Sequence, residues 1–586
     1  MYHKIIKTIL CLCTVVALVW ICDMPAEAEG IELESFGVDI TTGDEEFTYT
    51  VKWWRQDGIE GRECYITIPY DAKGKALKAN YVSGSDVWLN GILVNNGEVI
   101  PQLVEGHNSI LCAGLDYSLY VIYGSDIPTV HITTASGSME NVYEDIDYKE
   151  SGYVTILSDD KIEYEGELEY IKGRGNYTWT RRKKPFNIKL KEKANLFEMG
   201  SAKKWTLLAN YLDDTMLKNK LGFDFADEIG LDFSPESVLT DVYIDGEYIG
   251  NYTFSESVEV RKSRVNITDL EELNEKANEG LNLEELELGG IRGEKSHLEF
   301  GSSKWVELPN TPEVITGGYL LEFELDVRYD EEVSGFVSDY GQSVNIKSPK
   351  YASRQQVEYI SSYYQEFEDA VLNGDGYNHL GKHYSEYIDV ESFAKMYVFQ
   401  EYVKNLDAGL SSFFMYKDVG GKMTVGFVWD LDSAFGRATE REGIRMDDPT
   451  GLWVTDGHLH GDLSDKYTIF ALLCQHNDFK EEAKKQWNQY VAPCIDGLLL
   501  NLDTLQEEAF VSIFTDKFKW IVEGSYSEAY EFTSASIENL RDFINQRRAY
   551  LSGVFYDEIY TLEYDSNGVE KLKAKICHFI KNMLHL

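Results

Sequence analysis

Two aspartates separated by a predicted hairpin are the residues best suited to chemistry. Asp407 follows an apolar helical run, and Asp430 ends an apolar segment that returns from a turn. Between them, residues 413–417 read as a strand and Gly420-Gly421 supplies the turn. We therefore expect one acid at the end of a helix and the other at the end of the returning strand, both at the same end of the hairpin. Phosphoryl transfer needs such a pair, because one carboxylate must lie near the acceptor hydroxyl and another must hold the metal that bridges the phosphates.

Other interpretations of the two acids remain open. A catalytic loop, a hairpin and a metal-binding acid occur in this order in protein kinases. Taken singly, Asp430 could cap a turn and Asp407 could be a solvated loop acid. The pair could also serve as the acid and base of a glycan-hydrolysing enzyme. Their order after a strand-rich region favours phosphoryl transfer.

A turn and strand upstream supply candidate phosphate-binding cations. Arg174 opens a segment with a glycine turn, and residues 183–190 follow as a lysine-rich strand. Three apolar residues of this strand alternate and should face a core: Phe186, Ile188 and Leu190. Asn187 and Lys189 would share the opposite face, toward a cleft. From these residues alone, a surface hairpin with solvated lysines is the simpler interpretation.

The elements around these residues indicate an α+β fold with two lobes. Strands are expected from residue 127 to about 191, a helix near 214–230, and a hairpin at 240–254. Residues 268–310 are rich in Glu, Gly and Asn, so we expect an insertion or surface loop. Beyond residue 350 the pattern is mostly helical, which predicts a helix-rich back lobe behind a strand-rich front lobe.

Other segments are predicted at both ends of this domain, and the C-terminal one is expected to dock on the back lobe as a helix rather than to lie on a membrane or wall. Residues 1–28 have the layout of a secretory signal, with Lys4 and Lys7, an apolar run and a small-residue cleavage site. Residues 29–125 read as short strands between turns, which predicts a small β-sandwich of cadherin-like or Ig-like type. The kinase-like domain would span 126–565, and 566–586 would be a basic amphipathic tail. No segment makes a firm membrane span.

Charge and cysteine content exclude several classes of function. The formal net charge is −45, which repels phosphate backbones and argues against nucleic acid as a partner. It favours cations and basic proteins. Of eight cysteines, Cys11, Cys13 and Cys22 lie in the signal, and none of the others has zinc-site spacing. The remaining five could be buried thiols or could include bridges Cys64–Cys112 and Cys474–Cys494, with Cys577 left over.

Several motifs in this order resemble the CotH family, named for a spore coat protein. They are residues 174–179 with 184–186, 205–211, 214–219, 250–252 leading to Glu256, and 429–432. Residues 127–436 follow the family order throughout. The resemblance implies an atypical secreted kinase that phosphorylates serines on exported proteins with ATP and Mg²⁺ or Mn²⁺.

The resemblance also implies roles for individual residues. Asp407 takes the place of the catalytic acid and Asp430 that of the metal-binding acid. Lys189 takes the place of the nucleotide lysine, and the helix near Asp214 that of the helix that positions it. The other candidate contacts to the nucleotide are Arg174, Lys184 and Glu256.

The chain departs from the family pattern at one place. Many relatives carry an asparagine a few residues after the catalytic acid, whereas Ser411 and Ser412 stand here. A serine hydroxyl ligates a hard cation more weakly than an amide or carboxylate oxygen. Ser412 is kept as a candidate metal ligand. We expect a protein kinase that is secreted or lies in the spore coat or at the cell surface. Its partners would be serine-rich, basic exported proteins, with wall or coat association through the β-sandwich. The alternative is a weak or inactive kinase-like structural protein.

Overall fold

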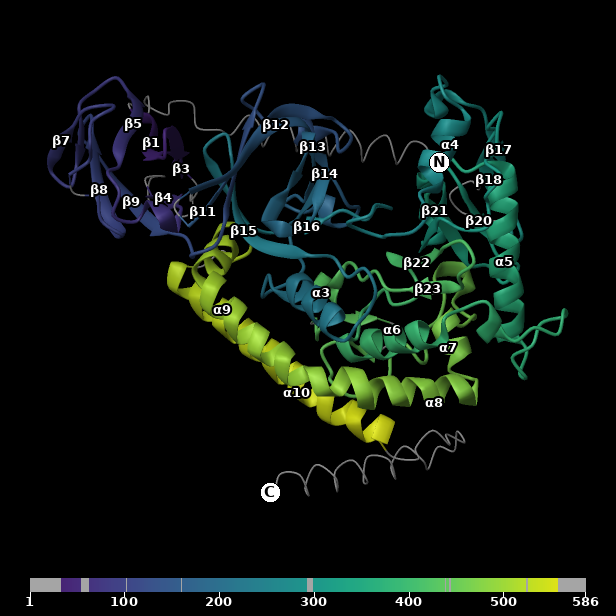
Figure 1. Cartoon of the computed structure of the whole chain (residues 1–586). Helices are drawn as coiled ribbons and strands as arrows, with labels where there is room; N and C mark the ends of the chain where they lie inside the picture. Colours follow the sequence, from purple (N-terminus) through teal and green to yellow (C-terminus); the bar gives the residue numbers. More distant parts are fainter. Residues whose placement is uncertain are drawn as a thin grey trace, which may run out of the picture. The chain divides into compact units, whose positions relative to one another are not determined.

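The computed structural model describes residues 33–53, 63–101, 103–159, 161–291, 299–437, 439–441, 444–522 and 525–556. The expected signal at 1–28, the tail at 566–586 and cysteines 11, 13, 22 and 577 lie outside these ranges. The chain divides into two compact units, Met1–Gly124 with Gly246–Tyr248, and Ser125–Asp245 with Ile249–Leu586 (Figure 1). None of the described helices is both long and apolar enough to cross a membrane.

The first unit consists of two β-sheets. One has the order β2-β1-β5 and the other the order β3-β4-β9-β8-β6-β7. The strands are β1 (Leu33–Thr42), β2 (Glu45–Thr50), β3 (Lys52–Trp53), β4 (Glu63–Ile68), β5 (Lys78–Ser83), β6 (Val87–Leu89), β7 (Ile92–Val94), β8 (Gly106–Cys112) and β9 (Leu115–Tyr123). In β8 every second side chain is buried, among them Ile110 and Cys112. This is the pattern of a sheet with one face in a core.

The described cysteines form none of the bridges left open by the sequence. Cys64, Cys112, Cys474 and Cys494 are all free thiols, and the first three are buried. The Cys64 thiol donates to the backbone carbonyl of Ser118 over 3.4 Å. The buried thiols therefore act as small apolar side chains with a weak hydrogen bond.

The second unit begins with a closed barrel of order β10-β11-β12-β13-β14-β16-β15 (Figure 1). Its strands are β10 (Thr129–Thr134), β11 (Glu150–Ser158), β12 (Lys161–Gly173), β13 (Phe186–Asn195), β14 (Ser201–Leu208), β15 (Ser237–Ile244) and β16 (Glu247–Glu256), with α2 (Glu140–Glu144) beside β12. The parallel pairing of β10 with β15 closes it. The alternating residues of β13 point into its core, as predicted: Phe186, Ile188 and Leu190 are at most 1% exposed.

After the barrel the chain forms a second sheet, of order β17-β18-β20-β21-β19-β22-β23. Its strands are β17 (Leu288–Gly290), β18 (Ser303–Val306), β19 (Tyr319–Phe323), β20 (Gly335–Val337), β21 (Ser343–Ser348), β22 (Phe413–Lys417) and β23 (Met423–Val425). A small hairpin follows, β24 (Glu440–Arg441) with β25 (Ile444–Arg445). The overall class is thus α+β, as the sequence indicated.

The segment 268–310, expected to be an insertion or surface loop, is in part built into this fold. It contains α4 (Leu270–Ala277) and contributes β17 and β18 to the edge of the second sheet. Asp269 caps α4 by accepting a hydrogen bond from the Glu272 amide, and Leu270 is completely buried. The apolar anchors are few and irregularly spaced, so the sequence shows no periodicity although the described parts of the segment contain a helix and two strands.

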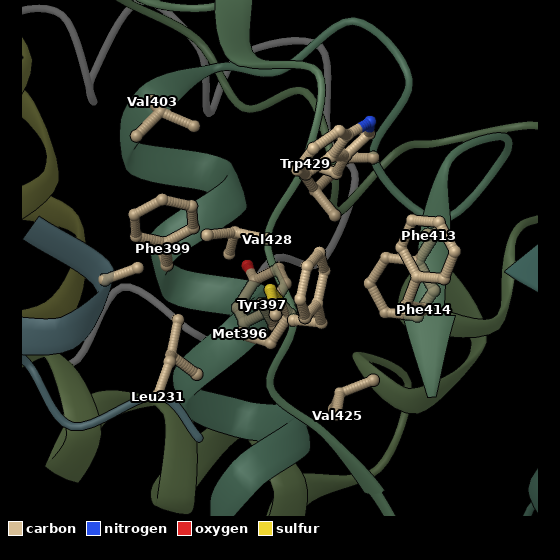
Figure 2. Close-up of a cluster of buried hydrophobic side chains, with 14 of the residues drawn as sticks. Leu231, Met396, Tyr397, Phe399, Val403, Phe413, Phe414, Val425, Val428 and Trp429 are labelled. Atoms are coloured by element: carbon tan, nitrogen blue, oxygen red, sulfur yellow. The ribbon is translucent and has the colours of Figure 1, made fainter. Parts of the chain in front are cut away.

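Helices share the largest core with the second sheet. They are α3 (Lys218–Glu228), α5 (Arg354–Leu372), α6 (Val390–Val403), α7 (Ile469–Leu473), α8 (Asn477–Gln486), α9 (Ala492–Trp520) and α10 (Tyr526–Tyr556). Figure 2 shows how α6 packs its apolar residues, including Phe399 and Val403, near those of β22 and of the segment that ends at Trp429. Both predicted acids follow directly from elements of this core.

The buried carboxyl group of Glu368 on α5 should make stability depend on pH. Glu368 is 1% exposed, and one of its oxygens accepts from the Ser338 hydroxyl over 2.8 Å. Burial raises its pKa from 4.5 to about 7. Because the folded state holds this proton to higher pH than the unfolded chain, the free energy of unfolding falls between pH 4.5 and 7. The loss is at most about 3 kcal/mol above that range.

We expect Glu368→Gln to be more stable than the wild type at pH 8, with the difference shrinking toward pH 4.5. Thermal or urea unfolding of both proteins across this range measures it. Glu358→Gln, on an exposed position of the same helix, should show little pH-dependent difference. An equal advantage of Glu368→Gln at pH 5 and pH 8 would contradict the assigned titration.

Candidate active site

The barrel and the second sheet together line a cleft of about 1070 Å³. Four of the residues singled out from the sequence line it: Arg174, Asp407, Ser412 and Asp430. They come from segments far apart in the chain. The barrel side contributes Arg174, just after β12, and the helical side contributes the two aspartates and the serine.

Asp407 is held in a turn that follows α6, not at the end of the helix as expected. The helix stops at Val403 because Lys404 adopts a left-handed conformation with φ 49°. The Lys404 ammonium donates to the backbone carbonyls of Arg445 and Asp448, over 2.9 and 2.7 Å. The Asn405 side chain then accepts a hydrogen bond from the Asp407 amide over 3.2 Å. The turn that presents Asp407 is therefore fixed from both sides.

A buried ion pair anchors the last turn of α6. Glu401 and Arg547 are both completely buried and lie 2.8 Å apart. Glu401 also accepts hydrogen bonds from the backbone amides of Trp453 and Val454, over 2.6 and 2.8 Å. Neither residue stood out in the sequence, since 146 residues separate them. Buried charges of this kind need both ionic and hydrogen-bonding partners.

Asp430 is presented by an irregular segment beyond the hairpin. Strand β23 ends at Val425, earlier than the sequence indicated, and Asp430 itself has φ 53°. Ser412 is also left-handed, with φ 51°, and its hydroxyl donates to Asp430 Oδ2 over 2.8 Å. A left-handed backbone is strained for residues with a side chain and is common at functional sites. The two acids thus border the same cleft, as the predicted hairpin requires, and Ser412 lies directly against one of them.

One face of α3 packs against the turn that contains Asp430. A Cβ on Gly222 would lie 2.2 Å from Leu431 Cδ1, so a larger residue here would force the leucine side chain to shift. Phe223 stacks on Trp429 with ring centroids 5.7 Å apart. Because Trp429 and Leu431 flank Asp430 in the chain, the helix supports the acid through both of its neighbours.

Arg174 faces the acids from the barrel side. Its guanidinium lies over the ring of Trp429, 5.3 Å from the centroid. Burial lowers the pKa of this guanidinium, and the charges of Asp430, Asp432 and Glu322 oppose that effect. A cation that stacks on an aromatic ring beside carboxylates is well placed to receive phosphate oxygens.

Three other candidates from the sequence do not line the cleft. Lys189 forms an ion pair with Glu169 on the neighbouring strand, over 2.7 Å. Asn187, on the same face of β13, does line the cleft, whereas Lys189 lies two residues further along the strand, beyond its edge. Lys184 donates to the Trp179 carbonyl, and Glu256 pairs with Arg264. Their surroundings give them structural contacts in the barrel.

The structure adds cleft residues that the sequence did not indicate. Lys347 on β21 pairs with Glu322 over 3.2 Å, and both line the cleft. Arg328 pairs with Glu324 over 2.9 Å and points at the side-chain amide of Asn176 across the cleft. With the amide oriented so that its oxygen accepts, Arg328 Nε lies 3.0 Å from that oxygen. No local motif marks Lys347 and Glu322, because the pairing of β21 with β19 brings them together.

The donor atoms near Asp430 fit a hard divalent cation. Asp432 also lines the cleft, and its pKa is raised to about 7, first by burial and then by Asp430 and Asp213. With the Ser412 hydroxyl this makes an all-oxygen donor set. In the described part of the chain, no three His, Cys, Asp or Glu side chains form a metal site by themselves. Mg²⁺ needs no such cage, since it commonly uses one or two carboxylates together with waters and substrate phosphates.

Comparison with known proteins gives a match to a protein family. A protein-family model described as CotH kinase protein matches residues 171–551. This range includes Arg174, Asp407, Ser412 and Asp430, and it covers about two thirds of the 586 residues. No curated protein matches the chain.

Proposed function

The chain belongs to the CotH kinase protein family, and on that premise we propose that it is an exported protein serine kinase. It would use ATP with Mg²⁺ or Mn²⁺. The observation that carries the proposal is the gathering of Arg174, Asp407, Ser412 and Asp430 around one cleft. In this proposal the barrel is the front lobe of a two-lobed kinase-like domain, and the second sheet with its helices is the back lobe.

Each of these residues has a task in the proposed reaction. Asp407 orients the acceptor serine hydroxyl and accepts its proton, because the carboxylate borders the cleft from a fixed turn. Arg174 binds phosphate oxygens from the opposite side. Asp430, Asp432 and Ser412 supply oxygen ligands for the cation. When bound, the cation neutralises negative charge on the phosphates.

Charge supports a basic class of acceptor. A net charge of −45 attracts basic proteins and repels acidic ones. We propose serine-rich, basic exported proteins as substrates, in the spore coat, at the cell surface or in the medium. The first unit, built of two sheets, would hold the protein to a wall or coat.

The proposal is tested with the purified chain, labelled ATP, Mn²⁺ and a basic serine-rich protein. We expect label on serine, and we expect its loss when EDTA removes the metal. Calorimetry should show ATP binding only when Mn²⁺ is present. Transfer that persists in EDTA, or none to any acceptor despite metal-dependent ATP binding, would contradict the proposed reaction.

Two observations favour a second candidate, a kinase-like coat or surface protein with weak or no catalysis. Lys189 lies outside the cleft, and a serine stands where many relatives carry an asparagine. In that case calorimetry would detect no metal-dependent ATP binding, while the chain would still associate with coat or wall preparations.

A further inference from the structure

A chain of buried amide groups runs from the barrel to the turn that carries the acids. Asn210 follows β14 and is 3% exposed. Its Nδ2 donates to the hydroxyl of Thr253 on β16 over 2.8 Å and to the Met216 carbonyl over 3.0 Å. Its Oδ1 accepts from Asn219 Nδ2 over 2.9 Å. Asn210 therefore uses both ends of its amide, and it fixes the orientation of the next amide.

Asn219, in the first turn of α3, links Asn210 to the turn that contains the acids. It is 4% exposed, and its Oδ1 accepts a hydrogen bond from the backbone amide of Leu431 over 2.8 Å. Leu431 lies between Asp430 and Asp432. The bond therefore holds the peptide unit that immediately follows Asp430, whose own backbone is left-handed.

Only an amide side chain can make this connection. Asn219 must donate toward Asn210 and accept from Leu431, which a leucine, a serine or a carboxylate cannot do at the same reach. In a buried site such bonds are strengthened by the low dielectric, and a missing partner is costly. The left-handed conformation of Asp430 is a state that surrounding contacts must maintain.

We infer that Asn219 is a positioning residue for the metal-binding acids, and that Asn210 orients it. Through this relay the Asp430–Asp432 turn is fixed relative to the barrel that carries Arg174. The relay then fixes the distance between the acids that bind the cation and the arginine that binds the phosphates of the nucleotide. The inference rests on the proposed function, since it assigns a divalent cation bound with a nucleoside triphosphate to this turn.

The test measures Mn²⁺ affinity of the full purified chain by calorimetry, without ATP or acceptor. We expect Asn219→Leu to weaken Mn²⁺ binding by about 10-fold or more, the effect typical of residues that orient metal ligands. Asn210→Leu should weaken it in the same direction. In transfer assays the Mn²⁺ concentration for half-maximal rate should rise, while KM for the acceptor stays unchanged. If the role of Asn219 were purely structural, its variants would lower the unfolding temperature without raising the Mn²⁺ concentration for half-maximal rate.

Asn274→Leu is the matched control. Asn274 is equally buried and bonds to Tyr351 and Gln356, away from the cleft. It should cost stability but leave the Mn²⁺ affinity of the folded protein at the wild-type value. If Asn219→Leu does not fold, Asn219→Ser, which is smaller and too short to reach Leu431, gives the same measurement.

Wild-type Mn²⁺ affinity in a folded Asn219 variant would overturn the inference, as would an equal loss in Asn274→Leu. Asp430→Ala separates this from failure of the proposed function. If Asp430→Ala loses Mn²⁺ binding and the Asn219 variants do not, the relay alone is wrong. If Asp430→Ala binds Mn²⁺ like the wild type, the proposed metal site itself is wrong.

Discussion

Asp407→Ala and Asp430→Ala should both abolish measurable phosphate transfer, but they should differ in what they leave intact. Asp407 borders the cleft from the turn after α6 and is not among the residues that we propose as metal ligands. Its loss removes proton acceptance and orientation of the hydroxyl, a contribution of about 10²–10⁴-fold. Asp430 is hydrogen-bonded to Ser412 and belongs to that donor set. Its removal should eliminate metal-dependent ATP binding as well as transfer.

Two measurements on each variant separate the roles. Calorimetry with ATP and Mn²⁺ should give near wild-type binding for Asp407→Ala and none for Asp430→Ala, while labelled transfer is lost in both. Asp375→Ala, in an exposed loop outside the cleft, is the matched control and should keep both properties. Unchanged transfer in either cleft variant would refute its assigned role. Loss of nucleotide binding in both would place Asp407 among the metal ligands.

Local sequence patterns predicted those parts of the site that depend on neighbours in the chain. The alternation in β13 indicated its buried face, and the helical pattern beyond residue 350 agrees with α5, which begins at Arg354. The turn at Gly420-Gly421 joins β22 to β23 as expected. Because a hairpin brings its two ends together, Asp407 and Asp430 could be assigned to one region without any long-range information, and both line the cleft.

The remaining features depend on contacts between distant segments. Lys189 lies on the predicted face of its strand. The edge of the cleft, however, depends on how the barrel packs against the second sheet. Beyond that edge, Lys189 forms an ion pair with Glu169 on β12. Parallel pairing of β10 with β15 closes the barrel across more than one hundred residues. Asn219 lay within a recognised motif, yet its bond to Leu431 spans 212 residues. The periodicity of apolar residues in a short segment of sequence cannot predict such contacts.

Arg547→Met should cost about 3–5 kcal/mol in the free energy of unfolding, the usual effect of removing one partner of a buried ion pair. Methionine fills much of the space but leaves Glu401 charged and without its cation. Arg547 also donates to the backbone carbonyl of Pro449 over 3.0 Å, so that group loses its donor too. Chemical denaturation monitored by circular dichroism measures the loss. Arg548→Met is the control, because Arg548 pairs with Asp496 at the surface and should cost no more than about 1 kcal/mol.

The double variant Glu401→Gln with Arg547→Met decides whether the cost comes from an uncompensated charge. Glutamine can still accept the amide hydrogen of Val454 through its carbonyl oxygen, although it replaces the oxygen that accepts from Trp453 by an NH2 group, and it carries no charge that needs a cation. The double variant should therefore be more stable than Arg547→Met alone. If the two losses simply add, the buried charge is not the cause, because coupled partners give non-additive losses. Since Glu401 also anchors the end of α6 that leads to Asp407, transfer should fall in Arg547→Met while Mn²⁺ affinity remains, whereas loss of both would show that the ion pair supports the whole cleft.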